Sequence, residues 1–119
     1  MTSKRSSQAR QATDISAAIT SIHRDSYARE LSSVDTTVGD GCVTSVLRFE
    51  VAPAERLVIA AGDADTVMRL YDATERSLEA PLRAAVERTT GRTVEAFQSS
   101  MNPRQGLIVE AFVLARDTY

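Results

Sequence analysis

Ionisable side chains in unusual surroundings are where this sequence could carry chemistry. His23 is its only histidine and Cys42 its only cysteine. A Ser-His-Asp arrangement would have to use His23, but Asp25 two residues on points elsewhere on a helix. We therefore interpret His23 as a structural residue at a helix boundary or contact. We interpret Cys42 as a small buried hydrophobe in a strand. A zinc site would need further nitrogen or sulfur ligands, and an all-carboxylate site has no spacing signature, so we predict no metal and no cofactor.

One carboxylate stands out because its neighbours are apolar. Glu110 lies within the run Leu107–Leu114, where an unpaired charge would be unfavourable. A facing arginine, Arg92 or Arg48, could satisfy it. Four further charged residues lie at helix or strand ends, where each could form an ion pair or bind a ligand. The predicted binding residues are Glu55, Arg56, Glu87, Arg92 and Glu110. No catalytic residue is predicted.

Composition excludes several function classes. The net charge is −2 and aromatic residues make up 5% of the 119 residues, which argues against a nucleic-acid surface. No GxxxxGK[ST] or GxGxxG phosphate-binding motif is present. No apolar run approaches the ~18–20 residues that span a bilayer, and no apolar stretch follows the basic N-terminus as in a secretory signal. We expect a cytoplasmic protein that does not insert into the membrane.

The N-terminal half predicts a tail, a helix and a hairpin. Residues 1–12 are polar, with three basic residues and no acid, and we expect them to be disordered. Thr13 or Asp14 can cap a helix to about Leu31 that carries an isoleucine stripe. Gly39-Asp40-Gly41 then separates two β-rich runs, 34–38 and 42–49. In the second run, the more apolar alternate set is assigned to the core: Val43, Ser45, Leu47 and Phe49.

Two helices and a second hairpin follow. Pro53 opens a short helix that ends at Ala60-Ala61-Gly62, and a longer one runs to Gly91. Pro81 predicts a kink or a break near Glu79-Ala80. The β-rich runs 94–99 and 107–114 flank a segment of turn formers. Together these elements predict one α+β domain over residues 13–119. It has two layers in the order α-β-β-α-α-β-β, with a four-stranded antiparallel sheet and helices mainly on one face.

The last strand carries apolar residues on both faces apart from Glu110. Such a strand in so small a protein indicates either a central sheet position or contact with a partner chain. We predict a homodimer on this ground.

The order of motifs resembles the MpsC family, which has been catalogued as a domain of unknown function. The strongest matches are Pro53-Ala54-Glu55-Arg56 and the runs Val86–Val94 and Val109–Leu114. The family name refers to a sodium-translocating, membrane-potential-generating system. The resemblance implies a non-catalytic cytoplasmic accessory or regulatory protein, with a membrane transporter or sensor as partner and a link to ion or bicarbonate (inorganic-carbon) uptake.

Two departures from the family pattern bear on function. The family typically has a Gly-x-Gly-Pro-like segment after the first helix, where this chain has Ala28-Arg29-Glu30-Leu31, and Ala52 replaces a capping threonine before Pro53. Two other function classes stay open. One is a small-molecule binding or sensory domain with a pocket between the sheet and the helix near Pro81. The other is an enzyme that uses carboxylates such as Glu55 or Glu110.

Overall fold

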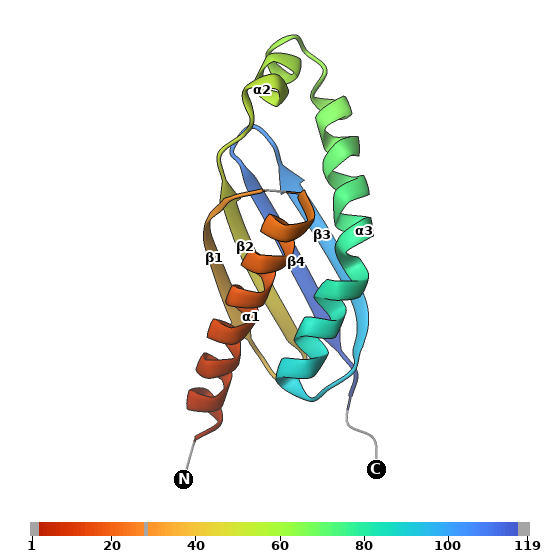
Figure 1. Cartoon of the computed structure of the whole chain (residues 1–119). Coiled ribbons are helices and arrows are strands. Elements are labelled where there is room, and N and C mark those ends of the chain that lie inside the picture. Colours follow the sequence, from red (N-terminus) through yellow and green to blue (C-terminus); the bar gives the residue numbers. More distant parts are fainter. Residues whose placement is uncertain (1–2, 28, 117–119) are drawn as a thin grey trace.

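Seven elements build the protein in the predicted order (Figure 1). The computed structural model describes residues 3–27 and 29–116. The elements are α1 Lys4–Tyr27, β1 Leu31–Val38, β2 Cys42–Phe49, α2 Pro53–Ala60, α3 Ala64–Thr90, β3 Val94–Asn102 and β4 Leu107–Leu114. The predicted α+β class and strand pairing are confirmed.

All pairings in the sheet are antiparallel, in the order β1-β2-β4-β3. β4 occupies a central position, as one of its two interpretations predicted. Figure 1 shows α1 and α3 lying across one face of this sheet. The alternate residues of β2 and β4 on that face are buried, among them Val43, Leu47, Ile108 and Phe112. Because adjacent residues of a strand point to opposite faces, β2 and β4 together form the floor of the core.

The face of the sheet away from α1 and α3 keeps a row of apolar side chains. Leu107, Val109, Ala111 and Val113 of β4 are partly or largely exposed there. Cys42 pairs with Val113 on the same face and is exposed, so the prediction of a buried cysteine is wrong. Cys42 is the first residue of its strand, and its register places it opposite the core side.

The first helix starts at Lys4, so the prediction of disorder is wrong for residues 4–12, and residues 1–2 lie outside the described part. Ser3 Oγ accepts a hydrogen bond from the Ser6 N–H at 3.1 Å, which caps the helix in place of Thr13 or Asp14. Asp40 of the β1–β2 turn receives Lys4 Nζ at 2.7 Å and Gln8 Nε2 at 3.1 Å. These contacts, and the absence of glycine and proline from α1, extend the helix over its polar end.

α2 and the first turns of α3 project beyond the end of the sheet (Figure 1). Pro53 begins α2 after Ala52, which makes no side-chain capping bond, as the sequence indicated. α3 is one continuous helix through Pro81, so no break occurs there, and Figure 1 shows its axis bending across the sheet. Leu57 of α2 is 73% exposed and Leu70 of α3 is 49% exposed. We call this projecting part, with its two exposed leucines, the α2–α3 tip.

Candidate functional site

Three ionisable side chains meet in the core between the helices and the sheet. His23 of α1, Glu75 of α3 and Glu110 of β4 are each at most 1% exposed. His23 Nε2 lies 3.0 Å from Glu110 Oε2 and 3.9 Å from Glu75 Oε1. One donor atom from each residue lies within 4.8 Å of the other two. We call these residues the buried His–Glu–Glu cluster.

Each element places its member of the cluster by the same periodicity that builds the core. His23 follows Ile19 by four residues, one helical turn further along the buried stripe of α1. Glu75 lies four residues after Tyr71 and three before Leu78, on the buried face of α3. Glu110 is on the helix-covered face of β4, where Ser45 and Ser99 are its neighbours across the sheet. The sequence therefore puts three polar groups where apolar residues would normally pack.

Burial controls the protonation of the cluster. The pKa of Glu75 is raised to about 9, mainly by loss of hydration and then by the hydrogen bond and the charge of Glu110. Burial also raises the pKa of Glu110 to about 7, against the lowering effects of the Glu75 hydrogen bond and the Arg29 charge. Burial lowers the pKa of His23, and the negative charge of Glu75 opposes this. In the empty cluster at neutral pH, Glu75 therefore carries a proton that it can donate to Glu110, and His23 is neutral.

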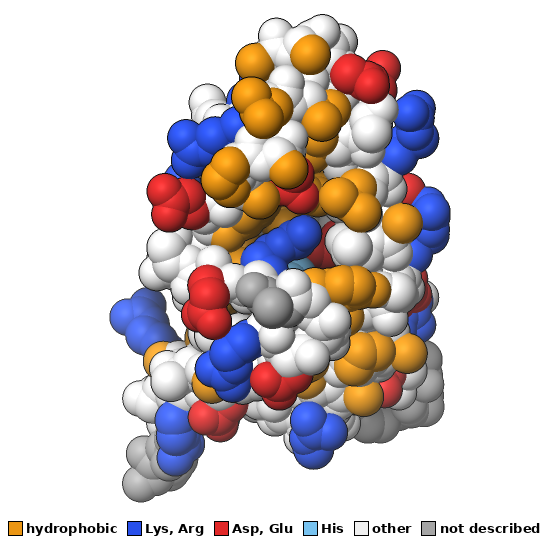
Figure 2. All heavy atoms as spheres, turned by 45° about the horizontal axis from the view of Figure 1, so that its top comes forward, with side chains coloured by type: hydrophobic (Ala, Val, Ile, Leu, Met, Phe, Trp, Pro, Cys, Tyr) orange, Lys and Arg blue, Asp and Glu red, His pale blue; other side chains and the backbone are white. Residues whose placement is uncertain are grey.

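Arg29 lies over the cluster at the end of α1. Its Cζ atom is 4.7 Å from the ring centroid of Tyr71 and 5.0 Å from that of Phe49. A cavity of about 290 Å³ borders it, lined also by Glu30, Glu50 and other residues of this end. In Figure 2 a basic side chain lies in a hollow of this face, with the pale blue of the single histidine just visible beneath it. Since the histidine can be seen through this hollow, the hollow is a route from solvent toward the cluster.

Two of the predicted binding residues lie near this route. Glu55 accepts a hydrogen bond of 2.6 Å from the Tyr71 hydroxyl. Burial, then the Glu55 hydrogen bond, raises the pKa of that hydroxyl. Arg56 Nε donates to the carbonyl of Val51 at 3.1 Å. Arg56 also contributes to a neighbouring pocket.

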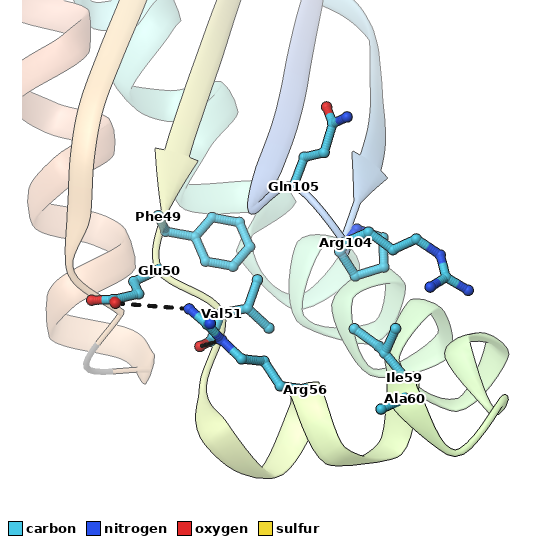
Figure 3. Close-up of a pocket in the computed structure, with 9 residues that line it drawn as sticks. Phe49, Glu50, Val51, Arg56, Ile59, Ala60, Arg104 and Gln105 are labelled. Carbon is cyan, nitrogen blue, oxygen red and sulfur yellow. Dashed lines mark hydrogen bonds and ion pairs between the residues drawn. The ribbon is translucent and has the colours of Figure 1, made fainter.

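That pocket has a volume of about 470 Å³ and lies between α2, the end of β2 and the β3–β4 turn (Figure 3). Apolar side chains such as Phe49 and Ile59 form part of its wall. Arg56 turns toward Glu50, whose Oε1 is 3.7 Å from an Arg56 nitrogen, and Arg104 lies across the opening (Figure 3). The size is within the range of small-molecule sites.

The other predicted residues are not brought together. Glu87 and Arg92 lie at the opposite end of the molecule, where Glu87 Oε2 accepts the Val94 N–H at 2.8 Å. Arg92 donates to the backbone carbonyls of Asp40 and Ala115. Glu110 lies in the core beside His23 and Glu75, so the prediction that Arg92 or Arg48 satisfies it is wrong. Arg48 points to the other face of the sheet.

Sequence reasoning missed two members of this region and misjudged a third. Glu75 was not singled out, although its spacing from Tyr71 and Leu78 puts a carboxylate on an apolar helix face. Arg29 was noted only as part of an altered loop, and Ala28 beside it lies outside the described residues. His23, interpreted as a structural residue at a helix boundary or contact, is fully buried and contacts Glu110. The expectation of no metal site considered nitrogen and sulfur ligands and an all-carboxylate set, but not the mixed set of one imidazole and two carboxylates that the fold brings together.

The fold and the cluster define a small α+β domain with an ionisable group of three residues in its core. The chain matches the family model described as "Na+-translocating membrane potential-generating system (MpsC)" over residues 7–116, and it belongs to this family. No curated protein and no solved structure is significantly similar to it. In the described part of the chain, no helix is long and apolar enough to cross a membrane.

Proposed function

We propose that this protein is a non-catalytic accessory or regulatory component of a membrane ion-translocating system. The family match over residues 7–116, with the system that its description names, carries this proposal. Since no described helix could cross a bilayer, ion movement would be the task of a separate membrane protein, a transporter or a sensor. The chain would act on it from the cytoplasmic side, in Na⁺ translocation or in the related uptake of inorganic carbon.

The α2–α3 tip is the surface we assign to the membrane partner. Leu57 and Leu70 are exposed on an element that stands clear of the sheet, and apolar side chains gather over this end in Figure 2. Exposed apolar patches of this kind mark interaction sites. Because both leucines already face solvent, changing them leaves the core intact.

Replacing both leucines (Leu57→Glu, Leu70→Glu) is expected to abolish function without unfolding the chain. In the native host, deletion of the gene should reduce the Na⁺-dependent membrane potential of inverted vesicles several-fold. The wild-type chain should restore it and the double variant should not. Arg88→Glu, a charge change at an exposed position near the other end of α3, is the control and should restore it. An unchanged potential in the deletion strain would contradict the proposal.

The homodimer is assigned to the apolar row on the outer face of the sheet. Val109 and Ala111 are partly buried by their own strand neighbours, and Val113 remains 37% exposed. Val113→Lys is expected to convert a dimer to a monomer in light scattering coupled to size exclusion, because a lysine ammonium resists desolvation at such an interface. The Leu57→Glu variant should stay dimeric. A wild-type chain that is still monomeric at about 100 μM would exclude this interface, because a dimer with a Kd below that concentration would form there.

A small-molecule binding or sensory domain is the second candidate, favoured by the pocket of about 470 Å³ in Figure 3. Its two arginines and apolar wall suit an anion with an apolar body. A smaller cavity of about 260 Å³ lies between α3 and β3, and its nearest lining residue to Pro81 in the sequence is Glu79. A metabolite that raises the melting temperature of the wild type but not of Arg56→Ala would favour this function over the first.

A further inference from the structure

We propose that the buried His–Glu–Glu cluster is a binding site for a divalent transition-metal ion of the Zn²⁺ class, held by His23 Nε2, Glu75 and Glu110. This inference rests on the arrangement of the core and is independent of the proposed function. It assigns a ligand to a group of side chains that neither the family description nor the fold explains.

The first argument is the unsatisfied state of Glu75. Both of its carboxylate oxygens are buried and accept no hydrogen bond from the residues that the structure describes, and Glu110 Oε1 is in the same condition. Buried polar groups without a partner are rare in folded proteins and destabilise them. A proton between Glu75 and Glu110 would pair one oxygen of each, and it would still leave the second Glu75 oxygen without a partner, which an ion held between the three side chains would supply.

The second argument is charge. Two ionised carboxylates and a neutral imidazole carry −2, which a divalent cation neutralises. Arg29 is the nearest basic side chain, yet it stacks on Tyr71 and Phe49 and makes no ion pair with either glutamate among the described contacts. It does not take the place of a ligand.

The third argument is geometry and donor type. Donors bound at roughly 2.0–2.2 Å from one ion lie roughly 3–4 Å apart. Those of the cluster are within 4.8 Å of one another, so a small movement of the Glu75 side chain closes the site. One imidazole nitrogen with two carboxylates suits Zn²⁺, Fe²⁺ or Co²⁺ better than Na⁺, Mg²⁺ or Ca²⁺, which prefer oxygen alone. His23 Nε2 is hydrogen-bonded to Glu110 Oε2 at 3.0 Å, so a bound ion would take the place of the proton between these two atoms.

Zn²⁺ and Co²⁺ are the probes for the test. The full-length chain carries Cys42→Ser, which removes an exposed thiol that binds zinc by itself. It is freed of any tag and of metal, and then titrated at pH 8 by calorimetry. We expect one Zn²⁺ per chain, and a visible absorption spectrum with Co²⁺ that reports a low coordination number. Glu75→Gln and Glu110→Gln should each weaken binding at least tenfold.

Glu79→Gln is the matched control, since it removes a carboxylate from the same helix at a partly exposed position. It should bind as the parent does. Circular dichroism of each metal-free variant shows whether it is folded, and one folded glutamine variant is sufficient for the test. Equal affinity in folded Glu75→Gln and in the parent would overturn the proposal. So would the absence of any binding by the parent at millimolar Zn²⁺ or Co²⁺.

Discussion

Replacing Gly106 by alanine is expected to destabilise the protein by about 3 kcal/mol, a loss typical of backbone strain combined with a steric clash. Gly106 has a φ of 62°, in the left-handed region that favours glycine. A Cβ atom at this position would lie 2.0 Å from the carbonyl oxygen of Phe49, which is backbone and cannot rotate away. The Phe49 N–H also donates to the Gly106 carbonyl at 3.0 Å, so movement of either strand would break a bond.

Gly91→Ala separates the clash from the conformational effect. Gly91 has a φ of 71° at the end of α3, but a Cβ there would meet no heavy atom within 4 Å. Gly91→Ala should therefore lower the free energy of unfolding by only about 1 kcal/mol. Urea unfolding of both variants gives the comparison. Equal losses would show that the turn before β4 yields easily, and that its contact with the end of β2 does not hold the sheet together.

The architecture was predictable because it depends on local patterns. Alternation placed Val43, Leu47 and Phe49 on the core face, and Gly91 ended α3 where a left-handed cap was expected. The start of α1 was the exception. Composition made residues 4–12 look disordered, whereas Ser3 caps the helix and Asp40, distant in sequence, receives Lys4 and Gln8. A tertiary contact therefore makes this segment helical, and its two sides are too far apart along the chain for a local sequence pattern to show it.

The cluster was only half predictable for the same reason. The apolar neighbours of Glu110 showed that it would be buried, but not which group it would meet. His23 is 87 residues away along the chain, and the two touch because α1 crosses the sheet above the centre of β4. Glu75 carried a local signal, a carboxylate on an apolar helix face. Its meaning depended on the crossing of α1 and α3, which residue spacing does not determine.

In metal-free protein, the free energy of unfolding is expected to fall by about 1 kcal/mol per pH unit between pH 7 and 9. Glu75 has a pKa of about 9 in the folded chain and an ordinary value of 4.5 when unfolded. Between these values the folded state holds a proton that the unfolded state has released. Raising the pH therefore favours the unfolded state, and the stability that the protonated form provides is lost as the pH passes through 9.

The other ionisable groups around Glu75 explain why its effect on stability is expected between pH 7 and 9. Glu110 from β4 acts in the same direction, but only up to its pKa of about 7. His23 from α1 has a lowered pKa and acts in the opposite direction, at pH values up to 6.5. The Tyr71 hydroxyl has its pKa raised above its ordinary value of 10, so it does not change protonation below pH 9. Glu75 therefore governs most of the slope between pH 8 and 9.

Glu75→Gln should remove this slope, because an amide carries no titrating proton. Between pH 7 and 9 the stability of the variant should therefore rise by about 2 kcal/mol relative to the wild type. Urea unfolding at pH 7, 8 and 9 in the presence of EDTA measures it, and Glu79→Gln should keep the wild-type slope. Parallel curves for the wild type and Glu75→Gln would mean that the core admits water at Glu75. Saturating Zn²⁺ in place of EDTA should reverse the trend for the wild type and for Glu79→Gln but not for Glu75→Gln, since the ion binds the ionised glutamate and therefore binds more tightly as the pH rises.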